Sequence, residues 1–241
     1  MSHPRIGTSG WSYDHWTGPF YPDGLPADRR LAHYAARLDC AEVNSTFYKL
    51  PSEQTLEHWR DSVPGEFRFA VKASRYITHL KKLKDPESGL DNFLPRVERL
   101  GERLGPVLFQ LPPRWRFDAG RLRTFLDALP GQHRYALELR DHSWINDATL
   151  QILSDHGAAF CIYELDGYLS PLAVTADLVY VRLHGPAGVY AGRYDDTVLE
   201  SWAGRIGRWH DEGLDCWCFF DNDEAGHAVG DALTLRGMLE V

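Results

Sequence analysis

The sequence predicts one α/β domain over residues 1–241, a (β/α)8 barrel of the TIM-barrel type with a polar site at the carboxyl ends of its strands. Eight short apolar runs alternate with amphipathic stretches along the chain, which indicates parallel strands joined by crossover helices. The length of 241 residues suits eight such units in one domain. A doubly wound sheet is the alternative, but no glycine-rich phosphate-binding motif follows any of the runs.

The eight apolar runs are typical of strands because each is short and rich in β-branched or aromatic residues. They span residues 5–11, 40–47, 67–74, 106–112, 134–140, 158–164, 178–185 and 215–223. Seven stretches between or after them have helical patterns and start or stop signals, such as a Ser52 cap. These stretches are 28–38, 52–63, 89–101, 118–129, 146–157, 196–213 and 225–240. The segment 165–177 offers little helix, so we expect an irregular connection there.

Composition excludes some classes of protein. The net charge of −8 argues against nonspecific coating of nucleic acid, which depends on Lys and Arg at phosphates. No apolar run reaches the ~18 residues of a membrane span, and the first residues do not resemble a signal peptide. We therefore expect a cytoplasmic protein with no membrane partner. The four cysteines lie in apolar runs, where we expect buried, reduced thiols: Cys40, Cys161, Cys216 and Cys218.

Polar residues of one parity interrupt the strand-like runs near their ends. Residues i and i+2 of a strand point to the same face, so Glu138 and Arg140 share one face while Leu137 and Leu139 share the other. The same alternation directs a polar set toward the barrel axis, where barrel active sites are built. The set comprises Glu42, Asn44, Thr46, Lys72, Gln110, Glu138, Arg140, Arg182 and His184. In the last run the alternation does not decide between Asp221 and Asn222. A network that serves only the fold is the alternative interpretation.

Three members of this set are candidates for catalytic proton transfer. Glu138 lies beside Arg140, which would keep it ionised and suit it to act as a base. Glu42 has no cation adjacent in sequence, so burial would favour its protonated form and make it the candidate acid. His184 can serve as either acid or base near neutral pH.

The candidate ligand-binding residues surround these three. Lys72, Arg140 and Arg182 would converge on an anion, because guanidinium groups suit carboxylate and phosphate. The loop after His184 is rich in glycine and carries two tyrosines that could form a lid or stack on a ligand. An aromatic cluster that includes Trp11 follows the first run, and the basic segment 74–85 offers phosphate contacts. The full set is Trp11, Asn44, Tyr48, Lys72, His79, Gln110, Arg140, Arg182, Tyr190, Tyr194 and Asn222.

The sequence predicts no cofactor and disfavours a metal. Glu42, Glu138, His184 and Asp221 include ligand types that divalent cations accept. Three cationic side chains would crowd such an ion, and no pair of histidines has the H-x-x-x-H spacing of a zinc site. A divalent metal therefore stays an alternative and not the expectation.

Several short motifs resemble the YecE-like family, domain of unknown function 72. They are IGTSGWSY, EVNSTFYKLPS, FAVKASRYITH, LFQLPP, LELRDHSW, VRLHG with YAGRY, and FFDND, which occur in order along nearly the whole chain. The resemblance implies a TIM-barrel-like fold and no established reaction. It assigns family motif positions to Gly10, Trp11, Glu42, Asn44, Phe47, Tyr48, Lys72, Thr78, His79, Gln110, Pro112, Glu138, Arg140, Trp144, Arg182, His184, Gly185, Tyr190, Tyr194 and Asn222. The ending FFDND departs from the family's FNN-like ending, which weakens the case for Asp221.

Three functional hypotheses follow. The first is an enzyme, a hydrolase, lyase or isomerase, that applies acid–base chemistry to a small anionic ligand bearing phosphate or carboxylate, such as a sugar or nucleotide derivative. The second is a nucleic-acid-binding or processing protein, by analogy of fold with endonuclease IV. The third is a barrel that binds a ligand without turnover. The substrate, the reaction and the oligomeric state are not encoded in these patterns.

Overall fold

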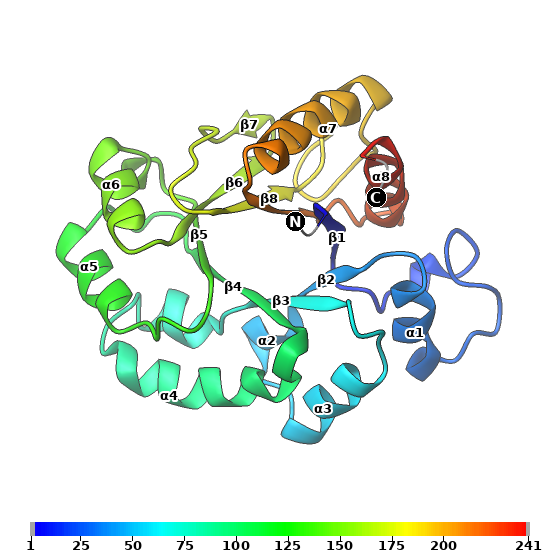
Figure 1. Cartoon of the computed structure of the whole chain (residues 1–241), viewed down its shortest axis with the longest axis horizontal. Coiled ribbons are helices and arrows are strands. Elements are labelled where there is room, and N and C mark those ends of the chain that lie inside the picture. The colour runs from blue at the N-terminus through cyan, green and yellow to red at the C-terminus, as the bar shows by residue number, and fades with distance from the viewer. Residues whose placement is uncertain (1–2, 240–241) are drawn as a thin grey trace.

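A computed structural model describes residues 3–239, and within them eight parallel strands close into a barrel (Figure 1). The neighbouring order is β5-β4-β3-β2-β1-β9-β8-β6, and pairing of β5 with β6 closes the ring. The predicted fold class is confirmed. The strands are β1 (Arg5–Ser9), β2 (Cys40–Val43), β3 (Arg68–Lys72), β4 (Leu104–Leu111), β5 (Tyr135–Leu139), β6 (Ala159–Leu165), β8 (Leu178–Leu183) and β9 (Asp215–Phe220).

The helices lie outside the ring of strands (Figure 1). They are α1 (Arg30–Ala35), α2 (Ser45–Tyr48), α3 (Glu53–Asp61), α4 (Pro86–Val97), α5 (Ala119–Asp127), α6 (Asp147–Asp155), α7 (Asp196–Asp211) and α8 (His227–Met238). Ser52 caps α3 as predicted, because its side chain accepts a hydrogen bond from the Thr55 amide. The predicted irregular connection after β6 contains β7 (Tyr168–Leu169), which pairs antiparallel with β6. Residue 240, at the end of the last predicted helix, lies outside the described residues.

Seven of the eight predicted strands end earlier than the sequence suggested, and three of these ends determine which segments carry site residues. The run 40–47 stops at Val43, and α2 follows because the Asn44 backbone is helical, with φ −93° and ψ −21°. The Thr46 hydroxyl donates hydrogen bonds to the carbonyls of Val43 and Lys72, which holds this turn against β3. The runs 178–185 and 215–223 likewise end as strands at Leu183 and Phe220. Asn44, His184 and Asp221 therefore lie on the segments that follow the strands.

Two layers fill the barrel. The lower one, toward the amino ends of the strands, is largely apolar and consists of Cys40, Ala70, Leu108, Ala136, Ala159, Cys161, Leu178, Tyr180, Trp217 and Phe219. Residues two positions further along several of these strands form the polar layer, as the alternation predicts. The opposite parity, with Val71, Leu137 and Val181 among its members, packs against the helices in the outer core. All four cysteines are buried and free, as expected.

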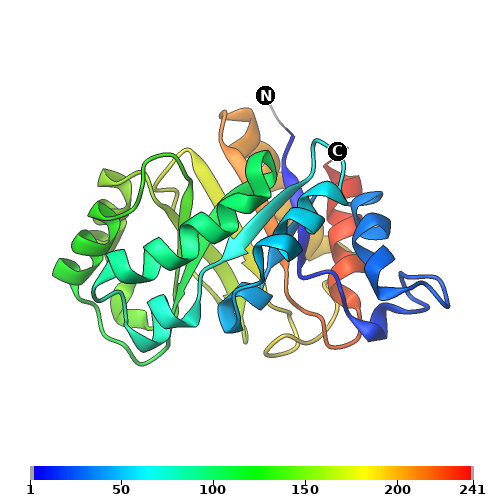
Figure 2. The same ribbon diagram turned by 90° about the horizontal axis from the view of Figure 1, so that it is seen from below.

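The molecule has one face of loops at the carboxyl ends of the strands. Figure 2 shows the loops after β8 and β9 on the side opposite the two chain ends. The polar layer therefore lies beneath the face on which barrels build their sites. Among residues 3–239, no helix is long and apolar enough to cross a membrane.

Candidate functional site

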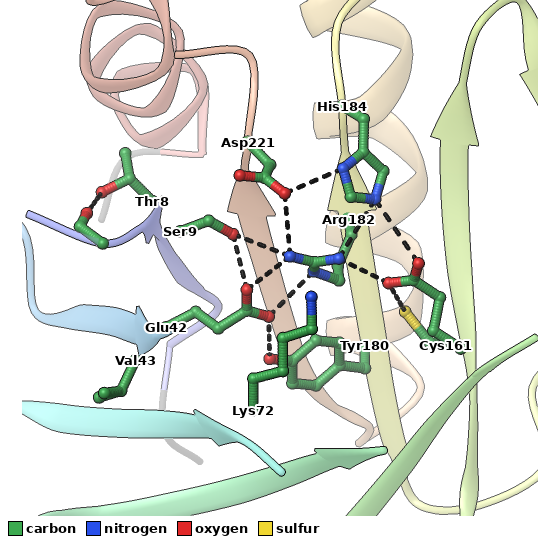
Figure 3. Close-up of polar contacts among 12 residues, drawn as sticks. Thr8, Ser9, Glu42, Val43, Lys72, Cys161, Tyr180, Arg182, His184 and Asp221 are labelled. Atoms are coloured by element: carbon green, nitrogen blue, oxygen red, sulfur yellow. Dashed lines mark hydrogen bonds and ion pairs between the residues drawn. The ribbon is translucent and has the colours of Figure 1, made fainter. Parts of the chain in front are cut away.

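Arg182 on β8 is the centre of the polar layer (Figure 3). Its Nε and Nη2 donate to the two carboxylate oxygens of Glu42 over 3.0 and 2.7 Å. Its Nη1 donates to Glu138 over 2.7 Å, and Nη2 also reaches Asp221 over 3.0 Å. Arg182 is 1% exposed and all three guanidinium nitrogens have carboxylate partners. It serves the network, and its predicted contact with a ligand anion stays a prediction.

Glu42 is enclosed on every side. Besides Arg182, its carboxylate accepts hydrogen bonds from the Ser9 hydroxyl over 2.6 Å and the Tyr180 hydroxyl over 2.7 Å. The side chain has no exposed surface. The sequence argument for Glu42 as an acid depended on the absence of a cation adjacent in sequence, but in the fold Arg182 binds its carboxylate through two nitrogens. The partner comes from 140 positions further along the chain, so proximity in sequence could not reveal it.

Glu138 and Arg140 on the β5 side form the ion pair that the strand alternation predicted. Arg140 also directs Nη2 at His184 Nε2 over 3.0 Å, and its guanidinium stacks on the Tyr163 ring 5.0 Å away. Burial alone would raise the pKa of Glu138, but Arg140 and Arg182 hold it well below its ordinary value. Glu138 is therefore an ionised, fully buried carboxylate at neutral pH.

His184 lies between the arginines and Asp221. Its Nε2 is 3.0 Å from Arg140 Nη2 and 3.3 Å from Arg182 Nη1. Guanidinium groups only donate, so Nε2 accepts and the ring carries its proton on Nδ1. Nδ1 lies 3.0 Å from the Asp221 carboxylate, although the approach is too bent for a good hydrogen bond. His184 is fully buried beneath the Tyr190 ring, whose centroid is 5.4 Å away.

Lys72, at the end of β3, is a cation of this layer without a carboxylate partner. In Figure 3 its side chain extends toward the network, and no dashed line reaches its nitrogen. Among residues 3–239 its Nζ makes no hydrogen bond or ion pair and instead sits 4.6 Å from the centre of the Phe47 ring. Burial lowers the pKa of Lys72, the Arg182 guanidinium lowers it further, and the three carboxylates oppose this shift.

A cavity of about 520 Å³ opens above the network. Its lining includes two groups of opposite charge that are not paired with each other, Lys72 and Asp221. The full lining is Tyr13, Asn44, Tyr48, Lys72, Val189, Tyr190, Ala191, Asp221, Asp223 and Glu224. The Asp221 side chain is 17% exposed, whereas Glu42 and Glu138 have no exposed surface. Asp221 is thus a carboxylate that belongs to the network and also reaches the cavity.

Four of the predicted ligand-binding residues line this cavity, namely Asn44, Tyr48, Lys72 and Tyr190. Trp11 lines an adjoining hollow of about 350 Å³, which shares Tyr13, Asn44 and Tyr48 with the cavity. Trp11 itself is 8% exposed and packs edge-on against Trp59, with ring centres 5.0 Å apart. An aromatic side wall beside a polar cavity is a surface on which a flat ligand can stack.

Tyr194 and Asn222 are not brought to the cavity. Tyr194 is 1% exposed, and its hydroxyl accepts from the Gly185 amide over 2.9 Å. Asn222 is fully buried and donates to the Gly192 carbonyl and to Asp231 over 2.8 and 2.7 Å. Both residues fasten the loop after β8 to α8. The choice that the strand alternation left open is decided: Asp221 faces the network and Asn222 faces the helix layer.

His79 and Gln110 lie beside the network without joining it. His79, in a π-helical turn over Tyr76–Leu80, packs edge-on against the Phe47 ring 4.9 Å away, and Phe47 also supports Lys72. Burial and the nearby Lys72 lower the pKa of His79. Gln110 pairs in register with Glu138, and its side-chain amide donates to the Leu111 carbonyl over 3.3 Å.

Sequence reasoning did not identify Ser9, Tyr13 and Tyr180 as members of the site. Ser9 and Tyr180 bind Glu42, and the Tyr13 hydroxyl donates to the Ser9 carbonyl over 2.5 Å while its ring lines the cavity. The signal for Tyr180 was present, because it lies two residues before Arg182 and shares its strand face. Within residues 3–239, no group of three or more His, Cys, Asp or Glu side chains is placed to hold a metal ion.

Comparison with known proteins establishes the family. Residues 5–241 match the family described as "Protein of unknown function DUF72". The chain belongs to the DUF72 family. The UPF0759 proteins YecE of Escherichia coli K12 and O157:H7 are 33% identical to it over 139 residues, a match covering 56% of this chain and 47% of YecE. The chain thus matches about half the length of these curated relatives.

Solved structures of DUF72 proteins share the barrel. A DUF72 protein of Thermotoga maritima MSB8 superposes over 100% of both chains with a TM-score of 0.90 at 28% identity. One from Enterococcus faecalis V583 covers 98% of this chain and 95% of its own, with a TM-score of 0.82 at 20% identity. The predicted family resemblance is confirmed, and membership in DUF72 establishes the fold but no reaction.

Proposed function

We propose that this DUF72 protein is an enzyme that applies acid–base chemistry to a small anionic ligand in the cavity above Arg182. The observation that carries the proposal is the joint presence of Lys72 and Asp221 on the cavity wall, unpaired with each other, above a fully buried ion network. A barrel needs no such layer for stability, because apolar residues fill barrel interiors. A cytoplasmic location is part of the proposal and suits the free cysteines.

Asp221 is the general base of this proposal. Burial would raise its pKa, but Arg182 and His184 outweigh burial and lower it below the ordinary value. Asp221 is then ionised at neutral pH and can accept a proton from a bound ligand. The sequence predicts Glu138 and His184 to be catalytic. In this proposal they act indirectly, because they hold Arg182 and Asp221 in position.

The charge on Lys72 attracts the ligand. Arg140 and Arg182 each bind a carboxylate of the protein, whereas Lys72 meets only the Phe47 ring. A carboxylate or phosphate of a ligand would supply the partner that Lys72 lacks. The cavity volume of about 520 Å³ fits a metabolite-sized molecule.

Nucleic acid is a weaker candidate for the partner. The net charge of −8 weighs against a long polyanionic partner, which needs many Lys and Arg contacts at its phosphates. The basic segment after β3 carries exposed Lys82 and Lys84, which gives the hypothesis its only surface support. A salt-dependent mobility shift with single-stranded DNA would favour it over the small-ligand enzyme.

A screen of phosphate esters and carboxylic acids tests the proposal, with D221N as the diagnostic variant. We expect turnover of at least one class, and a loss of ~10²-fold or more in kcat for D221N, measured at a temperature at which circular dichroism shows the variant to be folded. The control is D61N, because Asp61 is an exposed carboxylate remote from the cavity. If compounds bind saturably but none of them is turned over, the protein is instead a barrel that binds a ligand without catalysis. Equal activity of D221N and wild type would overturn the role of Asp221.

A further inference from the structure

Lys72 is unusual among the lysines of the chain. The sequence contains five, which are Lys49, Lys72, Lys81, Lys82 and Lys84. The other four lie at the surface, where Lys81, for example, pairs with Asp85 over 3.2 Å. Lys72 alone belongs to the barrel interior, at the carboxyl end of β3. Its backbone is fixed by the Thr46 hydroxyl, which donates to the Lys72 carbonyl over 2.6 Å.

A cation with a purely structural role has surroundings that favour its charged form. The surroundings of Lys72 favour its charged form less. A cation that balances buried carboxylates touches them, as Arg140 and Arg182 do. Lys72 touches the face of Phe47 and has the Arg182 guanidinium as a neighbouring positive charge. Partial desolvation and an adjacent cation are the two conditions that lower the pKa of a lysine and expose its nucleophilic lone pair.

The groups that face Lys72 from other elements oppose one another. Glu42, Glu138 and Asp221 favour the ammonium form, whereas burial and Arg182 favour the amine. His79, from the turn after β3, packs edge-on with the same Phe47 ring. The balance lowers the pKa of Lys72, so its amine is more available than those of the surface lysines. Arginine could not replace it in this respect, because a guanidinium does not release its proton in proteins.

We infer that Lys72 is the nucleophile of a Schiff-base reaction, and that the ligand is an aldehyde or ketone bearing a carboxylate or phosphate. This inference rests on the proposed function and names its substrate class. The Nζ lone pair attacks the carbonyl carbon, the C=O π electrons move to oxygen, and one proton passes from nitrogen to that oxygen. The carbinolamine then takes up a further proton and loses water, which leaves a C=N bond between the ligand and a positively charged Nζ.

The iminium explains why Asp221 lines the same cavity. A positively charged C=N draws electrons from the bonds of the neighbouring carbon. When a C–H bond there breaks, its electron pair forms the enamine and its proton passes to the ionised Asp221 carboxylate. Return of that proton to the same carbon, from either face, restores the iminium, and attack of water on its C=N carbon then releases the carbonyl product and regenerates the amine. No oxidant, reductant or metal enters this sequence.

Reductive trapping tests the inference on the unmodified full-length protein. Wild type is incubated with sodium cyanoborohydride and one of three probes: pyruvate, glyceraldehyde 3-phosphate or uncharged propionaldehyde. Intact mass spectrometry counts the adducts, and peptide mapping locates them. We expect one adduct per chain with an anionic probe, at Lys72, formed at least tenfold faster than at any surface lysine. Labelling spread over the surface lysines, with Lys72 unmodified, would overturn the inference.

Two variants separate this inference from the proposed function. K72R keeps a positive charge but cannot form an imine, so it should lose the adduct while still binding a carboxylate or phosphate by calorimetry. K49R is the matched control and should label like wild type. Should K72R fail to fold, K72M and the peptide map of wild type still decide the site. Retained anion binding and turnover with no Lys72 adduct in wild type would refute the Schiff base and leave the acid–base enzyme intact.

Discussion

Replacement of Arg182 by methionine tests whether the ion network holds the barrel together. The guanidinium is 1% exposed and binds three carboxylates, of which Glu42 and Glu138 are fully buried. Methionine fills much of the same volume without charge. In R182M, Glu138 keeps Arg140, and Asp221 keeps the exposed part of its side chain at the cavity, where water can solvate it. Glu42 keeps only the hydroxyls of Ser9 and Tyr180.

The expected loss of unfolding free energy follows from the number of buried carboxylates that R182M leaves without a cation. Removing one partner of a buried ion pair costs ~3–5 kcal/mol, because the other charge remains buried without compensation. One carboxylate, Glu42, is left in that condition, so we expect R182M to lose about 3–5 kcal/mol of unfolding free energy. With total stabilities of ~5–15 kcal/mol, this is a large fraction of the whole. At a urea m-value of about 3 kcal/mol per M, the midpoint should fall by roughly 1–2 M.

The difference in stability between wild type and R182M should change with pH in a defined direction. In wild type, Glu138 has a folded-state pKa well below the ordinary 4.5, so its contribution to stability is present above pH 4.5 and is lost as pH falls through the folded value. In R182M a buried carboxylate has lost its cation, and because this cost applies to the charged form alone, it falls as pH falls. The difference in stability between the two proteins should therefore be largest at neutral pH and narrow toward acid pH.

Urea unfolding followed by circular dichroism at several pH values measures this difference. The control is R60M, because Arg60 forms an exposed pair with Asp61 on α3 and its loss should leave the midpoint unchanged. An R182M midpoint equal to that of R60M at neutral pH would refute the reasoning. A deficit that grows toward acid pH would refute it equally, because stranded carboxylates require the opposite trend.

Two further predictions concern the buried thiols and the loop after β8. Burial raises the pKa of the four cysteine thiols, so Ellman's reagent should label none in the folded protein and all four in urea: Cys40, Cys161, Cys216 and Cys218. Rapid labelling without denaturant would contradict this. Gly185 has φ +109° and a Cβ there would clash with the Ala191 carbonyl, so G185A should cost ~1–3 kcal/mol or more. G204A on α7 is its control and should be neutral or stabilising by thermal melting, because nothing crowds a Cβ at that position.

The fold could be predicted from local patterns because each strand shows its own periodicity. The alternation of apolar and polar residues correctly divided Val71, Leu137 and Val181 from Lys72, Glu138 and Arg182. The same rule failed beyond the strand ends. Asn44 was assigned to a strand, but the backbone turns into α2 after Val43. Alternation carries no information once the extended backbone ends, so it could not decide between Asp221 and Asn222 either.

The sequence predicts much of the membership of the site but little of the pairing within it. Strand alternation brought Glu42 and Arg182 to one layer, but it could not show that they bind each other through two hydrogen bonds. That pairing depends on the closure of the ring and on side-chain reach across it. The sequence therefore indicates Glu42 as a candidate acid and Arg182 as one of three cations that converge on an anion. In the folded protein each satisfies the other, and the groups left for a ligand are Lys72 and Asp221.

The charge balance of the layer links the two proposals. Three carboxylates, Glu42, Glu138 and Asp221, face two arginines, so the layer without Lys72 carries one net negative charge when His184 is neutral. An ammonium on Lys72 balances this negative charge and attracts an anionic ligand. A neutral amine on Lys72 leaves the negative charge of the layer unbalanced. An iminium on Nζ restores the positive charge at the same atom. An anionic carbonyl compound first pairs with the ammonium of Lys72. When protons from the ammonium pass to the carbonyl oxygen and this oxygen leaves as water, the covalent iminium has the same total charge as the ammonium and the ligand before the reaction. The three carboxylates therefore stabilise the iminium as they stabilise the ammonium, and the amine form is needed only in passing.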